Sequence, residues 1–201
     1  MKRVLLAFLT LSITVGTIAA TKPLPAPVRD VVERALANER AAAARYDAYA
    51  ARADEDGYAG AAALFRAQAR AERTHAERFL SILRSDGGAI PPEPAIDPRT
   101  DATDDNLRAA VFAERSERDG IYREAIDVCK LHDAADVAKI FDETRDTEVE
   151  HANLCNAAAR DLQSMKEPKV FYVCGRCGYT TDVKLPFCPA CQHKAALATV
   201  E

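Results

Sequence analysis

Tryptophan is absent from this chain of 201 residues, glycine occurs only 8 times, and aromatic side chains make up only 6% of the total. Scarce glycine beside abundant alanine favours helices over the tight turns of an all-β domain. Clusters of basic residues are also lacking, and the formal net charge is −4. These features argue against a nucleic-acid-binding protein and against attraction to anionic membrane surfaces.

The N-terminal residues 1–20 read as a targeting segment. The stretch MKRVLLAFLTLSITVGTIAA has two basic residues, an apolar run and small residues at its end, which is the order of a cleaved Sec-type signal peptide. The apolar run is short for a spanning helix, and an uncleaved membrane anchor is the alternative. We expect a periplasmic or otherwise extracytoplasmic protein, with no stable membrane insertion once the leader is removed.

The rest of the chain divides into four segments by composition. A Pro-rich spacer covers 21–27, a helical domain 28–165, a linker 166–169, and a small cysteine-containing domain 170–201. Apolar periodicity predicts helices over about 28–53, 58–85 and 104–131, with Thr103 or Asp104 as the N-cap of the third, and a fourth from the LHDAAD break to about 165. Short first and third connections and a long central crossover predict a ferritin-like four-helix bundle.

Two Glu-x-x-His motifs interrupt the apolar stripes of these helices. Glu72 with His75 and Glu148 with His151 share the same spacing, and a lone glutamate precedes each motif by 33 or 34 residues, namely Glu39 and Glu114. A single such motif is common by chance as a surface pair, but buried carboxylates in this repeated arrangement need cations. Oxygen and imidazole donors on facing helices predict a carboxylate-bridged di-iron or di-manganese centre.

A tyrosine follows each lone glutamate. Tyr46 lies at +7 from Glu39, and Tyr122 lies at +8 from Glu114. Each could be an ordinary core residue, or its phenol could donate a hydrogen bond to a metal-binding carboxylate and so support the site from outside.

The small C-terminal domain contains two cysteine pairs, Cys174 with Cys177 and Cys188 with Cys191. Four thiolates in two Cys-x2-Cys knuckles predict a tetrahedral iron or zinc site, and ligand type alone does not separate the two metals. Two disulfides are the alternative in an exported protein. A metal is favoured because so short a segment cannot bury a core of its own.

The remaining histidines, the two other cysteines and one knuckle residue receive structural interpretations. His132 falls at a helix end, and His193 lies beside the second knuckle but is not expected to bind its metal. Cys129 and Cys155 fall at opposite ends of the bundle, too far apart for a disulfide, and are read as buried small hydrophobes. Gln192 follows the last cysteine, where a positive φ is often required and a side chain is penalised.

Together these motifs resemble the rubrerythrin family, which joins a ferritin-like di-iron domain to a rubredoxin-like domain. The matching stretches are ERAAAARY, AERTHA, ERSERDGIY, EVEH, CGRCGY and CPAC. The resemblance implies that Glu72 and Glu148 bridge the metals, that Glu39 binds one iron, and that Glu114 with His151 binds the other. It also implies that the first iron exchanges Glu117 for His75 between oxidised and reduced states.

The family's activity implies a non-haem di-iron peroxidase of oxidative-stress defence, an oxidoreductase. It would reduce hydrogen peroxide to water with electrons relayed from an unidentified donor protein through the rubredoxin-type iron. A ferroxidase or iron-handling protein is the alternative, and a non-catalytic metal protein is a third reading. The resemblance further implies a head-to-tail homodimer, since a tail distant from its own bundle would need a second chain.

Overall fold

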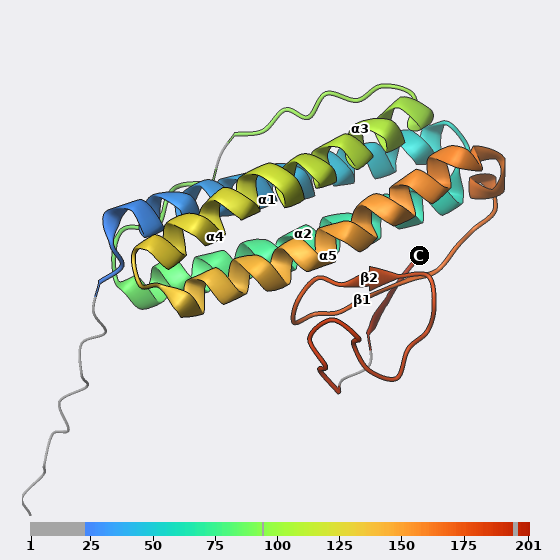
Figure 1. The fold of residues 1–201 in the computed structure, drawn as a ribbon. Coiled ribbons are helices and arrows are strands. Elements are labelled where there is room, and N and C mark those ends of the chain that lie inside the picture. The colour runs from blue at the N-terminus through green and yellow to red at the C-terminus, as the bar shows by residue number, and fades with distance from the viewer. Residues whose placement is uncertain (1–22, 94, 195–196) are drawn as a thin grey trace, which may run out of the picture.

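A computed structural model describes residues 23–93, 95–194 and 197–201, so the predicted leader lies outside the described residues. The bundle consists of α1 (Ala26–Glu55), α2 (Ala59–Asp86), α3 (Thr103–Ser116), a π-helical turn η1 (Glu117–Ile121), α4 (Tyr122–Leu131) and α5 (Ala135–Arg160). Helix α1 packs along α2, and the α3–α4 rod packs along α5 (Figure 1). The predicted ferritin-like bundle is therefore confirmed.

The third predicted helix differs from the expected continuous one. Glu117–Ile121 forms a π-helical turn between α3 and α4, so one rod carries a wide turn at its middle. The N-cap position belongs to Ala102, which makes no capping hydrogen bond, so the predicted cap at Thr103 or Asp104 is wrong. Asp56, which lies outside α3, caps the start of this helix. Its Oδ2 accepts hydrogen bonds from the backbone N (3.0 Å) and the Oγ1 (2.8 Å) of Thr103.

The fourth predicted helix also ends earlier than expected. Helix α5 stops at Arg160, and a 3-10 turn η2 (Leu162–Lys166) follows it. The carboxylate of Asp161 accepts a hydrogen bond from the backbone N of Ser164, which stabilises the turn and ends the α-helical hydrogen-bonding pattern.

Apolar side chains form two clusters inside the bundle. One contains α1 residues between Val28 and Leu36, and the other contains α1 residues between Ala42 and Ala53. Glu39 lies on α1 between these two stretches and is fully buried. The bundle thus has a polar layer sandwiched between two apolar ones, and this layer contains the glutamates and histidines of the predicted metal site.

The C-terminal tail forms a small antiparallel sheet of β1 (Phe171–Val173), β2 (Thr180–Thr181) and β3 (Ala198–Val200) in the order β2-β1-β3. Figure 1 shows this sheet beside α5, reached by a chain that turns back after η2. Phe171 and Val173 are buried in the same apolar cluster as Leu64 and Phe65 of α2, so the sheet shares a core with its own bundle. Among the described residues, no helix is both long and apolar enough to span a bilayer.

Candidate metal centres

The buried polar layer brings together side chains from four helices. Six of the predicted ligands have at most 1% of their surface exposed: Glu39 from α1, Glu72 and His75 from α2, Glu114 from α3, and Glu148 and His151 from α5. Burying this many ionisable groups without compensation would cost several kcal/mol each, on the order of the penalty for an isolated buried charge. A bound cation is the compensation that the arrangement requires.

These donors form two overlapping sets, in each of which all donor atoms lie within 4.8 Å of one another. The two sets are Glu39, Glu72, His75, Glu148 and Glu72, Glu114, Glu148, His151. Glu72 and Glu148 belong to both, which is the position that a bridging carboxylate occupies between two metals. Each set adds one further glutamate and one histidine, so the site has the pseudo-twofold symmetry expected from the repeated motif.

Both imidazoles present Nδ1 to the carboxylates. Nδ1 of His75 lies 3.0 Å from an oxygen of Glu72 and 3.2 Å from one of Glu148. Nδ1 of His151 lies 2.7 Å from Glu148 and 3.5 Å from Glu72. The ring centroids are 5.7 Å apart, so the two imidazoles flank the bridging carboxylates symmetrically.

Several buried donor atoms of this layer make no hydrogen bond of acceptable geometry, even where a polar neighbour is close. The atoms without a partner include Glu39 Oε2, Glu72 Oε1, Glu114 Oε2, both oxygens of Glu148, and His151 Nδ1. Native structures leave few buried polar atoms unpaired, and those that occur together commonly mark an ion. The donor set, four carboxylates and two imidazoles, fits two iron or manganese ions in chemistry as well as in position.

The metal-free charge distribution explains why cations are needed. Burial, followed by the negative charge of Glu72, raises the pKa of Glu114 to about 8 and that of Glu39 well above its usual range. Burial also opposes ionisation of Glu72, but the two histidines outweigh it and lower the pKa of that carboxyl. The metal-free site therefore holds protons where metal ions would otherwise supply positive charge.

The two tyrosines cross between the halves of the bundle. The hydroxyl of Tyr46 donates to Glu114, and the hydroxyl of Tyr122 donates to Glu39. Each phenol is buried, and each bonds the glutamate of the other helical hairpin rather than its own. These contacts favour the supporting role over the ordinary core interpretation, because they orient the two non-bridging carboxylates.

Glu117 lies outside both donor sets, although it is 8% exposed and therefore buried. It begins the π-helical turn η1. Burial, followed by the negative charge of Glu114, raises its pKa well above the usual range, and the guanidinium of Arg45 opposes this rise. His75 thus belongs to the first donor set, whereas Glu117 is a buried carboxyl that lies close enough to Glu114 and Glu72 to feel their charge.

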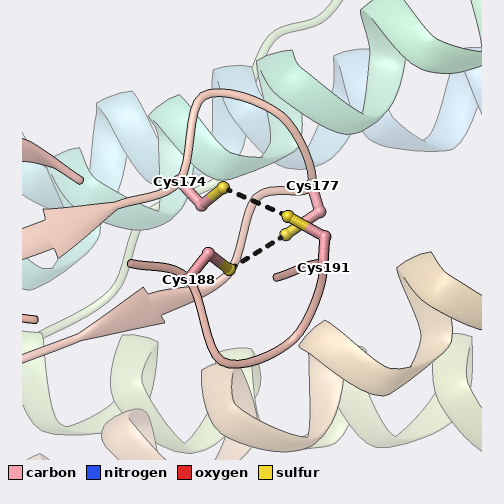
Figure 2. Close-up of side chains that lie close together, drawn as sticks. All are labelled: Cys174, Cys177, Cys188 and Cys191. Atoms are coloured by element: carbon pink, nitrogen blue, oxygen red, sulfur yellow. Dashed lines mark hydrogen bonds between the residues drawn. The ribbon is translucent and has the colours of Figure 1, made fainter. Parts of the chain in front are cut away.

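The four tail cysteines converge on one point between the two knuckles (Figure 2). All four Sγ atoms lie within 4.8 Å of one another, with 3.7 Å between those of Cys174 and Cys191 and 3.6 Å between those of Cys177 and Cys188. A tetrahedron with metal–sulfur bonds near 2.3 Å has sulfur–sulfur edges of about 3.8 Å. The thiols are free, and the spacing fits one tetrahedral metal rather than two disulfides.

The two other cysteines, the two other histidines and Gln192 lie outside both metal centres. Cys129 and Cys155 are free and buried in different apolar clusters. His132 is the C-cap of α4, and His193 is exposed and outside the cysteine cluster. Gln192 adopts φ 56°, as expected for its place after the last cysteine, and its side chain donates to the carbonyl of Pro189 at 2.7 Å.

The tail contacts the bundle site directly, which sequence reasoning missed. Nε2 of His75 lies 3.0 Å from the carbonyl oxygen of Cys177, and Nε2 of His151 lies 3.1 Å from that of Gly178. In this structure the tail therefore lies against the bundle of its own chain. One signal was available: the first knuckle is followed by glycine and the second by glutamine.

Comparison with known proteins agrees with this architecture. The family model described as Rubrerythrin matches residues 30–102. The rubrerythrin of Porphyromonas gingivalis is 30% identical over 81% of this chain and 84% of its own length. Rubrerythrin-1 of Clostridium acetobutylicum is 31% identical over 81% of this chain and 88% of its own.

Solved structures give the same result. The fully reduced, all-ferrous state of nigerythrin superposes with a TM-score of 0.76 at 27% identity, covering 89% of this chain and 91% of that one. Bacterioferritin BfrA of Mycobacterium tuberculosis, at 18% identity and a TM-score of 0.65, shares the fold of 73% of this chain. With a di-iron centre in its bundle and a cysteine-coordinated iron in its tail, this chain belongs to the rubrerythrin family.

Proposed function

We propose that this protein is an oxidoreductase that reduces hydrogen peroxide to water in oxidative-stress defence. The reaction consumes two electrons and two protons for each peroxide and yields two waters. A diferrous pair supplies both electrons together and acts as a Lewis acid. The observation that carries the proposal is the contact of the cysteine knuckle with His75 and His151, which puts a one-electron site directly against the di-iron site.

The residues of the bundle have separate roles in this proposal. Glu72 and Glu148, which belong to both donor sets, would bridge the metals, whereas Glu39 would bind one iron and Glu114 with His151 would bind the other. Tyr46 and Tyr122 hold the non-bridging carboxylates in place. Glu117, which is buried near Glu114 and Glu72, would exchange with His75 as a ligand when the oxidation state changes.

Iron handling, as in ferritins, is the competing activity. In that case ferrous ions are themselves the substrate and supply the electrons. A cysteine-coordinated iron that relays electrons to the bundle is then not needed. The rubrerythrin name of the curated relatives supports the relay reading. The bacterioferritin likeness concerns the fold only.

The test is a stopped-flow reaction of the fully reduced protein with peroxide or with oxygen. We expect peroxide to oxidise the bundle irons faster than oxygen does, and the ferrous tail iron to be oxidised afterwards, visible as the absorption of a ferric tetrathiolate. Faster reaction with oxygen, together with accumulation of a ferric mineral under excess ferrous iron, would instead establish iron handling.

The partners and the location belong to the same proposal. Electrons come from a donor protein, and two chains form a homodimer. The leader-like segment supports an extracytoplasmic location, where pyridine-nucleotide reductases are not expected and a membrane-linked or haem protein is the donor. Sequencing the N-terminus of native protein from cell fractions tests this. A soluble cytoplasmic protein that begins at Met1 would contradict it.

A further inference from the structure

The two tyrosines at the metal site have different ring neighbours. Tyr122 contacts the rings of Phe79 and Phe141, whose centroids are 6.2 and 6.0 Å away. Tyr46 instead contacts a second tyrosine, Tyr49, at a centroid distance of 6.1 Å. A phenol is far easier to oxidise than a phenylalanine ring, because it can release a proton as it loses an electron. Among the described residues, the two halves of the site therefore differ in whether a second oxidisable ring touches the first.

Glu114 joins the phenol of Tyr46 to the metal site. Its Oε1 accepts the hydrogen bond of the phenol, whereas its Oε2 makes no hydrogen bond and lies 3.6 Å from Nδ1 of His151. One oxygen of this carboxylate therefore faces the phenol, and the other faces the donor set that Glu114 and His151 share. A single carboxylate separates the Tyr46 ring from that donor set, and it can accept the proton that the phenol releases on oxidation.

Phe65 of α2 holds the two tyrosine rings of α1 in place. It is buried, stacks on Tyr46 (centroids 6.1 Å apart, 16° between the planes) and meets Tyr49 edge-on at 5.3 Å. Tyr46 and Tyr49 are three residues apart on α1 and so share one face of the helix. All three centroid distances lie within the range of direct aromatic contact. An electron that moves between the two phenols therefore crosses a packed contact.

Tyr49 brings this pair of rings to the surface of the bundle. Tyr46 has no exposed surface, whereas 6% of Tyr49 is exposed. Burial raises the pKa of the Tyr49 phenol, the guanidinium of Arg45 opposes this rise, and the carboxylate of Asp101 adds to it. Asp101 is an exposed residue of the crossover between α2 and α3, so Tyr49 lies close to solvent on that side. The two phenols thus span the distance from the metal site to the surface.

We propose that Tyr46 and Tyr49 carry an oxidising equivalent from the metal site to the surface when the site lacks one of the two electrons that peroxide requires. The inference rests on the proposed function, because it concerns the reaction of peroxide with a half-reduced metal pair. Such a pair supplies one electron, and the second must come from an oxidisable side chain nearby. The tyrosine path supplies it from Tyr46 and so spares the histidine ligands His75 and His151 from oxidation.

The electrons and protons of this path balance over three steps. One electron from the ferrous ion and one from Tyr46 break the O–O bond, two protons from solvent complete two waters, and the phenolic proton of Tyr46 moves to Glu114. Tyr49 then gives an electron to Tyr46, which regains its proton from Glu114, while the phenolic proton of Tyr49 goes to solvent. Finally a small thiol transfers a hydrogen atom to the Tyr49 radical, and two thiyl radicals combine to a disulfide.

The first test detects the radical after reaction with peroxide. Full-length protein carries zinc in the tail, which fits the four thiolates but supplies no electrons, and each pair of bundle irons is reduced by one electron. Freeze-quenching with peroxide should give a tyrosyl radical in the electron paramagnetic resonance spectrum, and a thiol should quench it. Tyr46→Phe should abolish this signal. Tyr49→Phe should leave a radical on Tyr46 that the thiol quenches at least tenfold more slowly.

Tyr122→Phe is the matched control, because it removes the equivalent phenol from the half of the site whose ring contacts are Phe79 and Phe141. At equal iron content it should give the same radical and the same quenching rate as the wild type. Three results would each overturn the path and leave peroxide reduction by the diferrous pair intact. These are no radical in the half-reduced wild type, equal loss of the signal in Tyr46→Phe and Tyr122→Phe, or quenching that Tyr49→Phe does not slow.

The second test uses no peroxide and so separates the path from the proposed function. A soluble ruthenium photo-oxidant, activated by a light flash, removes one electron at the surface of the fully reduced protein with zinc in its tail. The bundle irons should supply this electron through Tyr46 and Tyr49, and Tyr49→Phe should slow their oxidation at least tenfold at unchanged iron content. Equal rates in the two proteins would overturn the path. If Tyr49→Phe slows the reaction but peroxide does not oxidise the diferrous bundle, the path stands and the peroxidase function is wrong.

Discussion

The hydroxyl of Tyr122 on α4 donates a hydrogen bond to the carboxylate of Glu39 on the neighbouring helix α1, and so joins the two helical hairpins. Tyr46 and Glu114 make the reciprocal contact in the opposite direction. Neither glutamate belongs to both donor sets, so each phenol restrains a carboxylate that a bridging position does not already hold. The two hydrogen bonds therefore tie the halves of the bundle together at the metal site.

Replacing Tyr122 with phenylalanine should weaken metal binding without unfolding the protein. Glu39 would lose its hydrogen bond while burial stays nearly unchanged, and loss of such outer contacts typically lowers metal affinity about 10–100-fold. Competitive titration of the bundle metals with a chelator measures this effect. Tyr49→Phe is the matched control, since Tyr49 on α1 is also buried but makes no hydrogen bond to the metal site within the described part of the chain. Equal affinities of the two variants would show that the phenol is only a packing residue.

The π-helical turn could have been foreseen from the tyrosines but was not. Tyr46 follows its glutamate at +7 and Tyr122 follows at +8, yet both reach the opposite glutamate in the structure. A helical turn that holds one additional residue allows Tyr122 to occupy the position equivalent to that of Tyr46. The π-helix at Glu117–Ile121 is such a turn. Helical periodicity alone did not indicate the turn, because an α-helix can continue through either spacing.

The ligand layer was predictable because it depends on local spacing, whereas the docking of the tail was not. Glu and His three residues apart share a helix face in any α-helix, so the sequence defines the donor sets once the helices are recognised. His75 and Cys177 are separated by 102 positions, and no periodic pattern links them. Gly178, the glycine after the first knuckle, is the one feature of the sequence that indicates this contact.

Replacing Cys174 with serine should separate the two reactions of the protein. Loss of one thiolate removes the tetrahedral iron of the tail, so turnover driven by an electron donor should stop. The bundle, chemically reduced, should still react once with peroxide, because its ligands are intact. Absorption of the ferric tetrathiolate and single-turnover kinetics measure the two effects. Loss of both reactions in a folded variant would show that the relay is not a separate unit.

Removing the metals should make the stability of the protein fall as the pH rises from 6 to 8. Glu114 has a pKa of about 8 in the metal-free fold against an ordinary 4.5, so between these values the folded state holds a proton that the unfolded state has lost. The pKa values of His75 and His151 are raised well above 6.5, since neighbouring carboxylates outweigh burial. Their contribution is present below pH 6.5 and is lost as the pH rises through the folded values, so all three groups act in the same direction.

Glu72 and Glu148 have the opposite effect on the pH dependence of stability, but they act below the range from pH 6 to 8. The pKa values of Glu72 and Glu148 are lowered, so their contribution is present above pH 4.5 and is lost only as the pH falls further. Each proton held only by the folded state contributes a slope of about 1.4 kcal/mol per pH unit. Thermal unfolding of chelator-treated protein at pH 6, 7 and 8 measures it. Metal-loaded protein is the control and should lack the decline, because metal ions displace these protons. A flat metal-free profile would contradict the charge distribution.

Under the proposed function, Glu117 is the residue that would separate a redox enzyme from a storage protein in this fold. Both donor sets are complete without it, yet it is buried beside them at the start of the π-helical turn. Oxidation of two irons would add two positive charges, and under the proposed function a carboxylate moving onto one iron would offset one of them. Neutral His75 would replace it on reduction, so the net charge of the site would change by one unit per cycle instead of two.

Replacing Glu117 with alanine should therefore leave metal content unchanged and slow peroxide turnover. Single-turnover oxidation by oxygen should change less, since that reaction does not require return to the reduced state. Glu117→Gln is the control for shape: it preserves volume and hydrogen bonding but removes the charge, so it should behave like alanine if charge compensation is the cause. If glutamine retains wild-type turnover while alanine does not, packing explains the effect. If neither variant alters peroxide kinetics at full metal loading, the ligand exchange does not occur and iron handling becomes the better account of the bundle.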